Sequence, residues 1–352
     1  MARHFIRLIW NEFLLVRSNM AVLLIAVFQP ALLYFLMTLV LVHPTFDLNF
    51  VPSDNPDDDR LLKAMNEVGV QSGVPYINPI ILSTPSFNTG SQYIQIVEEN
   101  GVPVAVQHFA LVDSNMVKNY RNRLTAAGLI VWNEELGSGG IQITEKPLLP
   151  VDVPYRVYFG LAVAPMAAFL ATMLIGATST THDFENDTFL EYRLSPLHTG
   201  RIMAARIMRT MLFGYFAAAV LFMMIWLLSG YKPRSWIMSA VYLLPICLIG
   251  SSLGVSIGLA IRRPLPAFVL SLASTFVFWL LGGAFGLPSG FNSYYQIVSK
   301  FIPNTHVVEL MFPLFYGIQV GTPIISAGIL VVQSMLSLLI VGRLYNMKAV
   351  RG

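Results

Sequence analysis

Six stretches of roughly 20 mostly apolar residues, free of Asp, Glu, Lys and Arg within their apolar part, constrain this fold most. They cover residues 20–42, 157–178, 210–228, 237–261, 265–286 and 323–344. A bilayer core about 30 Å thick needs one such stretch per helical crossing. The 12% share of charged residues is about half that of an ordinary soluble domain. We therefore predict an all-α polytopic membrane protein with six transmembrane helices.

Lys and Arg residues near the ends of the stretches predict the orientation, since they favour the cytoplasmic side. With the N-terminus inside, the segments 1–19, 179–209 and 345–352 and the short turn after residue 261 lie in the cytoplasm. With Arg343, near the end of the last stretch, counted here as well, this side carries twelve basic and five acidic residues, and the other side ten basic and fourteen acidic ones. We expect both termini in the cytoplasm and a bacterial or archaeal plasma membrane, with a eukaryotic organelle left open. The first stretch is too long for a cleavable signal peptide, and we expect it to remain in the protein as the first transmembrane helix.

Residues 1–19 have the pattern of an amphipathic helix. Arg3 and Arg7 share one face, while Trp10 and Phe13 fall on the apolar face. We predict a helix that lies in the cytoplasmic membrane interface. The alternative is the water-exposed beginning of a long first helix.

Residues 43–156 are too numerous and too apolar for a loop. After a loose beginning, "PVAVQHFAL" is predicted as a strand and "DSNMVKNYRNRLTAAG" as a helix capped by Asp113 or Ser114 and stopped at Gly128. "LIVWNEE" and "GIQITEK" alternate like strands. We expect a small inserted α/β domain on the external side, without a disulfide because Cys247 is the only cysteine.

Residues 287–322 form neither a clean span nor a clean loop. Pro303, Asn304, Pro313 and Gly317 interrupt apolar patches that are too short to cross a bilayer. A re-entrant or interfacial hairpin on the outer side fits this pattern.

Several enzyme classes find no support in the sequence. There is no G-x-x-x-x-G-K-[ST] loop for ATP and no H-E-x-x-H zinc motif. The "GLPSG" around Ser289 lacks the strand and helix that flank a catalytic serine elbow. The stretches also lack the ionisable residues typical of ion-driven transporters. We therefore expect no catalytic site, cofactor or metal in this chain, and an energy source outside it.

Residues 180–201 are polar and lie between two apolar stretches. We predict a short helix that is capped by Thr181 or Asp183, has Glu185 and Asp187 in its first turn, and is ended by Pro196. A partner protein could push against such a helix. An ordinary solvated connection is the alternative.

This segment, "ENDTFLEYRLSPLHTGR", resembles the E-x-G-T-L-E-x-L-L-x-[ST]-P stretch of ABC-2 type transporter permeases, with Asp187 in place of the usual glycine. "IPNTHVVELM" is similar to the family's N-P-x-T-H-x-[VI]-E stretch, although here the proline precedes the asparagine. The layout of spans resembles the drug-export and lipid-export branch, which has a large external domain between the first two spans.

The resemblance implies an exporter subunit that moves a hydrophobic or amphipathic substrate using ATP and Mg bound in a separate subunit. It implies that this ATPase contacts a coupling helix and that a second permease chain, identical or related, completes the path. The implied coupling residues are Asp183, Glu185, Asp187, Thr188, Glu191, Arg193, Ser195 and Pro196. The interfacial helix would contribute Arg3, Arg7 and Trp10 to the same contact.

In the outer hairpin, Pro303, Asn304, His306 and Glu309 are expected to hold its fold or line an exit, or to anchor the last span. The substrate-binding residues stay unknown, and no nucleic-acid partner is expected. Two other functions stay open: a membrane receptor that senses through the external domain, and a secondary transporter that works without ATP.

Overall fold

The computed structural model describes residues 20–41, 46–53, 55–69, 75–85, 92–100, 102–109, 114–136, 155–188, 199–288, 293–317, 319 and 321–351. The chain divides into two compact units, a helical unit of Met1–Val40 with Pro147–Gly352 and an α/β unit of Leu41–Lys146.

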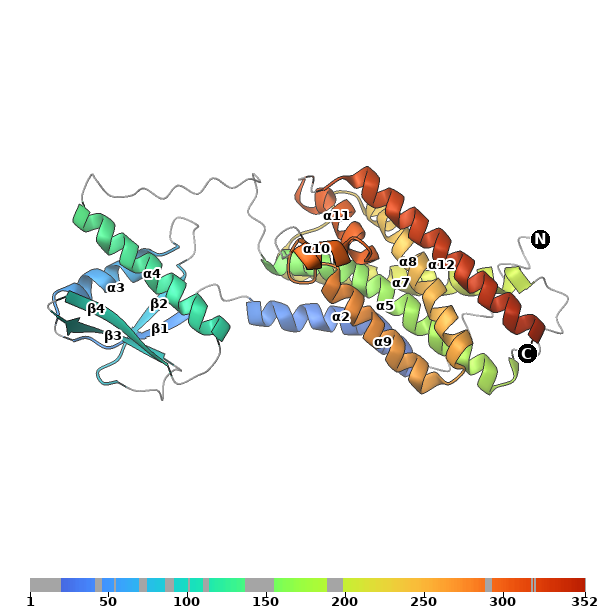
Figure 1. Cartoon of the computed structure of the whole chain (residues 1–352), viewed down its shortest axis with the longest axis horizontal. Helices are drawn as coiled ribbons and strands as arrows, with labels where there is room; N and C mark the ends of the chain where they lie inside the picture. The colour runs from blue at the N-terminus through green and yellow to red at the C-terminus, as the bar shows by residue number, and fades with distance from the viewer. Residues whose placement is uncertain are drawn as a thin grey trace. The chain divides into compact units, whose positions relative to one another are not determined.

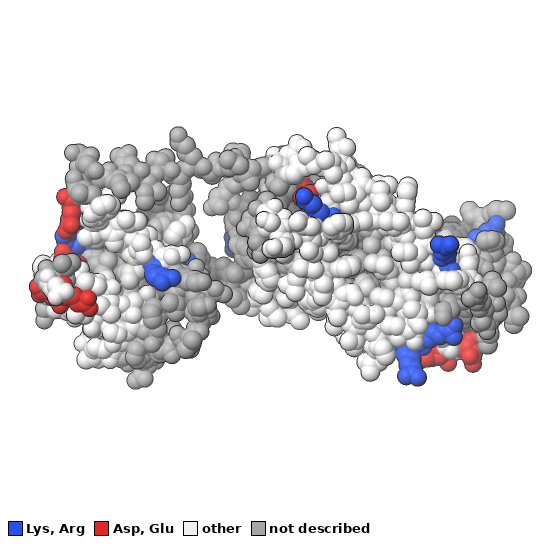
Figure 2. Space-filling view, in the orientation of Figure 1, with Lys and Arg blue, Asp and Glu red and all other residues white. Residues whose placement is uncertain are grey.

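Six helices in the described part of the helical unit are long and apolar enough to cross a membrane. They are α2 (Met20–Leu41), α5 (Tyr155–Glu185), α7 (Thr199–Ser229), α8 (Trp236–Ile261), α9 (Pro264–Leu281) and α12 (Pro323–Arg351). The prediction of a polytopic α-helical membrane protein is confirmed. On the face drawn in Figure 2, charged atoms of this unit lie toward its two ends and uncharged atoms lie between them.

The helices do not end where the apolar stretches end. The helix α5 continues past residue 178 to Glu185, and α7 begins at Thr199 instead of residue 210. The helix α9 ends at Leu281, five residues before the predicted boundary, because Gly282 and Gly283 follow and Gly283 has a φ of 100°. Polar turns can extend a helix beyond the hydrocarbon, so the predicted span boundaries stay predictions.

The helix α5 lies at the centre of the helical unit. Its most apolar window is fully buried, whereas the equivalent windows of α2, α9 and α12 are less than one third buried. Glycines on α8 let the two backbones approach closely. A β-carbon at Gly254 would collide with the Met173 carbonyl, and one at Gly258 would lie 2.7 Å from the Ala177 carbonyl oxygen. The α5–α8 contact therefore depends on these glycines.

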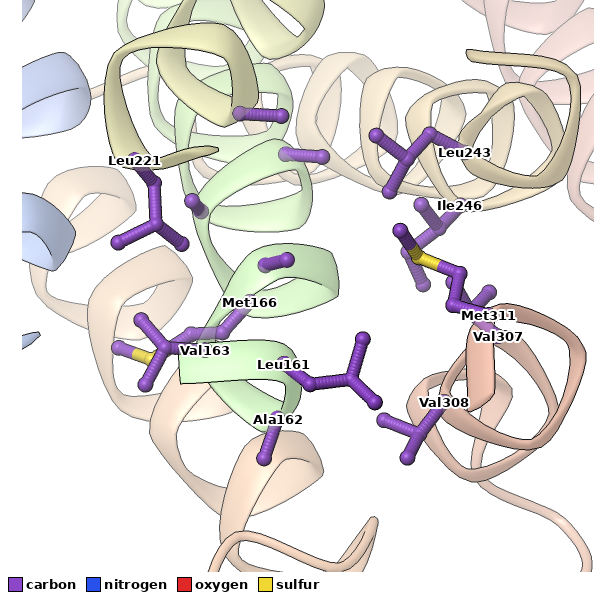
Figure 3. Close-up of a cluster of buried hydrophobic side chains, with 14 of the residues drawn as sticks. Leu161, Ala162, Val163, Met166, Leu221, Leu243, Ile246, Val307, Val308 and Met311 are labelled. Carbon is purple, nitrogen blue, oxygen red and sulfur yellow. The ribbon is translucent and has the colours of Figure 1, made fainter. Parts of the chain in front are cut away.

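Two shorter helices, α10 (Ser293–Ser299) and α11 (Pro303–Tyr316), fill the segment between α9 and α12. They lie at one end of the helical unit, and the C-terminal end of α12 lies at the other (Figure 1). The helix α11 is largely buried, and Val307, Val308 and Met311 join the core formed with α5 and α8 (Figure 3). The predicted hairpin segment thus contains two helices, one of them packed into the core.

The α/β unit contains a four-stranded sheet in the order β2-β1-β3-β4. The strands are β1 (Phe46–Phe50), β2 (Ile77–Ile81), β3 (Gln92–Glu99) and β4 (Val102–Phe109). The strand β1 is parallel to β2 and β3, and β3 is antiparallel to β4. The helices are α3 (Asp57–Glu67) and α4 (Ser114–Leu136). The prediction of a small α/β domain is confirmed, and the strand predicted for "PVAVQHFAL" corresponds to β4.

Two local predictions in this unit are wrong. The helix α4 does not stop at Gly128 but continues through "LIVWNEE", which was predicted as a strand. Leu124, Ala127 and Val131 recur at helical spacing against the core, while a β-carbon at Gly128 would have no neighbour within 4 Å. The start predicted as loose contains β1 and the first residues of α3. The segment "GIQITEK" and Asp113 lie outside the described residues.

Candidate functional site

A buried ion pair joins the C-terminal end of α5 to the first turns of α7. Asp183 Oδ2 contacts Arg206 Nη2, and the two side chains are 9% and 1% exposed. Arg206 Nη1 also donates a hydrogen bond to Thr180 Oγ1 at 3.4 Å. Arg209, one turn later, donates from Nη2 to Ser179 Oγ at 2.6 Å. Two arginines of α7 therefore hold the polar end of α5.

The end of α5 stays helical although it is rich in threonine. Thr178 Oγ1 donates to the Leu174 carbonyl at 2.7 Å, and Thr180 Oγ1 donates to the Gly176 carbonyl at 2.7 Å. Side chains that bond to carbonyls of the preceding turn can be buried inside a helix. The predicted short helix with Thr181 or Asp183 as its cap is therefore wrong at its start, because both residues lie within α5.

Glu185 and Asp187 lie at and just after the end of α5, not in the first turn of another helix. Asn186 N donates to the His182 carbonyl at 2.9 Å, and Asp187 has a left-handed φ of 55°. His182 Nδ1 lies 2.8 Å from Glu185 Oε2. Both acidic side chains are exposed. They are available to a partner at this end of the helical unit.

Of the other residues predicted to contact the ATPase, the structure describes only Thr188. Thr188 is partly buried, with its Oγ1 3.5 Å from the Asn186 carbonyl. The remaining coupling residues and the whole interfacial helix lie outside the described residues: Glu191, Arg193, Ser195, Pro196, Arg3, Arg7 and Trp10.

Further contacts bind this end of the helical unit into one block. The Arg262 guanidinium, at the turn between α8 and α9, lies 5.0 Å from the Phe184 ring centroid. Phe184 also packs against an apolar cluster built from α7, α8 and α12. The buried residues of this cluster are Ile207, Val255, Leu259, Val341 and Tyr345. A force on the end of α5 would therefore reach three other long helices.

A second polar cluster joins α11 to the beginning of α12. Ser326 Oγ donates to Glu309 Oε2 at 2.5 Å, and His306 Nδ1 lies 3.3 Å from Ser326 Oγ and 3.9 Å from Glu309 Oε2. His306 Nε2 bonds to the Lys300 carbonyl at 2.8 Å. Because a carbonyl only accepts, Nε2 carries a hydrogen. The cluster therefore links the α10–α11 turn, α11 and α12.

The environment of Glu309 favours its charged form. Burial, the largest single influence, would raise the pKa of the carboxyl. The nearby imidazole of His306 and the hydrogen bond from Ser326 outweigh burial and lower the pKa of Glu309 below its usual value.

Pro303 and Asn304 open α11. Pro303 occupies its first turn, where a missing N–H costs nothing. Asn304 is 1% exposed and lies against Gly282 at the end of α9. The four predicted hairpin residues thus belong to one helix, with His306 and Glu309 facing α12 and Asn304 facing α9.

Sequence reasoning missed Arg206, Arg209 and Ser326. In the sequence, the two arginines stand out only as cytoplasmic charges, and Ser326 lies within an apolar stretch. Arg206 and Arg209 are spaced so that they share one helical face. That spacing was the only available signal, since their partners on α5 are more than 20 residues away in the chain.

The described residues contain no group of three or more His, Cys, Asp or Glu that could hold a metal ion.

Comparisons with known proteins agree with the helical architecture. The model of the family described as ABC-2 type transporter matches residues 123–316, more than half of the chain. No curated protein matches the chain. The match includes α5, α7, α8, α9 and α11, and hence both polar clusters except Ser326. The chain belongs to the ABC-2 type transporter family.

Proposed function

We propose that this chain is the permease of an exporter driven by a separate ATP-binding subunit. Membership of the family makes it a multi-pass membrane component of an ABC transporter. Outward transport, a hydrophobic or amphipathic substrate and a docking surface around residues 183–196 are the parts that we add. ATP and Mg would be bound by the partner.

The buried pair of Asp183 and Arg206 carries this proposal. The ion pair joins the two helices that flank the proposed docking segment, and both of its side chains are nearly inaccessible. Breaking a buried ion pair leaves a buried charge without its partner and costs free energy. Movement of the two helix ends as one unit avoids this cost. A partner that closes on ATP would then shift α5 and α7 as one body, a ligand-driven change between two states.

The exposed acidic residues next to the ion pair would form part of the proposed docking surface for the ATP-binding subunit. Glu185 and Asp187 are exposed at the end of α5, followed by Glu191 in the segment that resembles the family's coupling helix. We propose that Arg3, Arg7 and Trp10 extend this contact from the interfacial helix. Both termini and the docking segment would face the cytoplasm of a bacterial or archaeal cell.

A second permease chain would complete the path, since six helices form half of it in the proposed arrangement. The outward-facing apolar side chains of α2, α9 and α12 provide area for such a partner and for lipid. We also propose that Pro303, Asn304, His306 and Glu309 keep α11 in place at the exit. The α/β unit would lie on the external side.

Gentle purification of the tagged chain from its native membrane, followed by mass spectrometry, tests the proposal. The expected result is a stoichiometric protein with a phosphate-binding loop that is lost when residues 183–196 are altered. An isolated homo-oligomer without any nucleotide-binding protein would contradict it and would favour a receptor role.

A further inference from the structure

Three side chains of α11 and α12 form a row of polar contacts in which the hydrogens can be counted. His306 Nε2 lies 2.8 Å from the Lys300 carbonyl oxygen, and His306 Nδ1 lies 3.3 Å from Ser326 Oγ. Ser326 Oγ lies 2.5 Å from Glu309 Oε2. The His306 side chain is 5% exposed and that of Glu309 is 22% exposed. The two nitrogens of the buried imidazole therefore depend on these protein partners.

The partners decide how many hydrogens the imidazole carries. A carbonyl oxygen has no hydrogen to give, so Nε2 donates to the Lys300 carbonyl. A serine has a single hydroxyl hydrogen, and that of Ser326 goes to Glu309. The contact between Nδ1 and Ser326 Oγ is then a hydrogen bond only if Nδ1 is the donor. Both ring nitrogens of His306 therefore carry a hydrogen, and the imidazole is positively charged.

The reverse order of donors holds the same number of hydrogens. Glu309 would donate to Ser326, which would donate in turn to a neutral His306. The lowered pKa of Glu309 opposes this order, because the carboxyl favours its charged form at this position. In either order, the three side chains hold one hydrogen more than a neutral imidazole, a hydroxyl and a carboxylate hold together.

Glu309 provides the counter-charge for the imidazole. Among the described residues, Glu309 is the carboxylate paired with His306, and His306 is the charge that acts on Glu309. The other charged residues near this end of the sequence segments involved are cations, Arg156 in the first turn of α5 and the exposed Lys300 before α11. Neither can replace Glu309 in this role.

The helices packed against α11 add no further group that titrates near neutral pH. These helices are α5, α8, α9 and α12. The helices α8 and α9 contain no Asp, Glu, Lys, Arg or His, α5 has none between Arg156 and His182, and the first in α12 is Arg343. The other titratable side chains of the core around α11 include phenols and one thiol, which stay neutral in this range: Tyr158, Tyr242, Cys247 and Tyr316.

The row of contacts connects separate segments of the chain. The Lys300 carbonyl belongs to the turn before α11, and Ser326 lies in the first turns of α12. A β-carbon at Gly321, just before α12, would lie 3.3 Å from Glu309 Cδ. If Nδ1 loses its hydrogen, the one hydrogen of Ser326 can serve only the imidazole or the carboxylate. One buried acceptor is then left without a donor, which costs free energy.

We infer that His306, Ser326 and Glu309 form a proton-binding site that fastens α11 to the beginning of α12 while the proton is bound. The proton comes from water, binds at Nδ1 and returns to water when the pH rises. The contact is complete only while His306 is charged and Glu309 is a carboxylate. An effect on export rests on the proposed function, which places α11 at the exit, whereas proton binding itself needs no ATPase.

The test measures the protonated fraction of His306 in the purified full chain in lipid nanodiscs. Hydrogen–deuterium exchange at the imidazole Cε1, followed by mass spectrometry, reports this fraction between about pH 5 and 8, where imidazoles titrate. We expect His306 to bind one proton in this range. Glu309→Gln removes the negative charge beside it and should lower the pH of half-protonation by about one unit. A His306 that stays neutral throughout, or a titration that Glu309→Gln leaves unchanged, would overturn the inference.

A serine variant tests the bridge between the two charges. Ser326→Ala removes the acceptor of the Nδ1 hydrogen, so His306 should again lose its proton at lower pH. Ser334→Ala is the matched control, because Ser334 is a buried serine of the same helix whose Oγ donates to the Leu330 carbonyl of that helix at 2.7 Å. An equal effect of the two substitutions on His306 would contradict the bridging role of Ser326.

Backbone amide exchange tests the link between the proton and the helix contact. After correction for the intrinsic effect of pH, amides of α11 and of the first turns of α12 should exchange about three- to tenfold faster once His306 has lost its proton, which corresponds to one hydrogen bond. Glu309→Gln should move this change to lower pH. Exchange that does not follow the titration of His306 would overturn the inference.

Failure of the proposed function looks different from failure of this site. In the first case the chain would purify without an ATPase, while His306 would still titrate and still depend on Glu309. In the second case an ATPase would purify with the chain, while His306 would stay neutral or would not respond to Glu309→Gln.

Discussion

Asp183 near the end of α5 and Arg206 in α7 form an ion pair whose carboxylate is 9% exposed and whose guanidinium side chain is 1% exposed. Removal of one partner leaves the other charge buried. We expect Arg206→Ala to lower the free energy of unfolding by about 3–5 kcal/mol. Thermal unfolding of the purified protein measures this. Arg201→Ala, an exposed position five residues earlier, is the control and should change little.

The same pair predicts a non-additive double variant. Asp183→Asn combined with Arg206→Gln removes both charges, so its loss of stability should be smaller than the sum of the two single losses. Strictly additive losses would show that the two side chains do not depend on each other.

The α5–α8 contact depends on Gly254. An added methyl group there meets the Met173 backbone, so Gly254→Ala should destabilise the protein by about 1–3 kcal/mol. Gly328→Ala is the matched control, because a β-carbon at that helical glycine has no neighbour within 4 Å. Unfolding temperatures of both variants in the same detergent test the prediction, and an equal effect at the two positions would refute it.

Gly128 gives the opposite expectation in the α/β unit. It lies inside α4 with free space around its β-carbon position, so Gly128→Ala should stabilise the unit by up to about 1 kcal/mol through higher helix propensity. Urea unfolding followed by circular dichroism would show this. A loss of stability would indicate that the helix ends at Gly128 after all.

The lowered pKa of Glu309 predicts that the protein loses stability in acid. Its pKa is lower in the folded state than the usual value of 4.5, so its contribution is present above that value and is lost as pH falls through the lowered pKa. Glu309→Gln should therefore reduce the dependence of unfolding temperature on pH below about 4.5, the same usual value. Glu99→Gln, which removes an exposed carboxylate, serves as the control. Identical pH profiles for the wild type and Glu309→Gln would contradict the assignment.

The long helices were predictable because uncharged apolar stretches of membrane length have few alternatives. The α/β unit was harder. "LIVWNEE" is rich in residues that favour strands. It forms a helix here because Ile130 and Val131 pack against the core of the unit in that conformation, a contact that the sequence alone does not show.

The candidate site was predicted in part. The coupling role predicted for Asp183 stays a prediction. Its ion-pair partner Arg206 lies on the next helix, and single-sequence periodicity does not reveal which helices pack together. The same holds for Ser326, which meets Glu309 only because α12 begins beside α11.

The most direct test of the central claim is ATP-driven transport by the complex of this chain and its ATPase in proteoliposomes. We predict that the wild-type complex moves substrate only with ATP. Glu191→Arg should reduce transport at least tenfold while the chain still inserts in the membrane, and Glu99→Gln should leave it unchanged. Wild-type transport by Glu191→Arg would contradict the proposed docking of an ATPase at this segment.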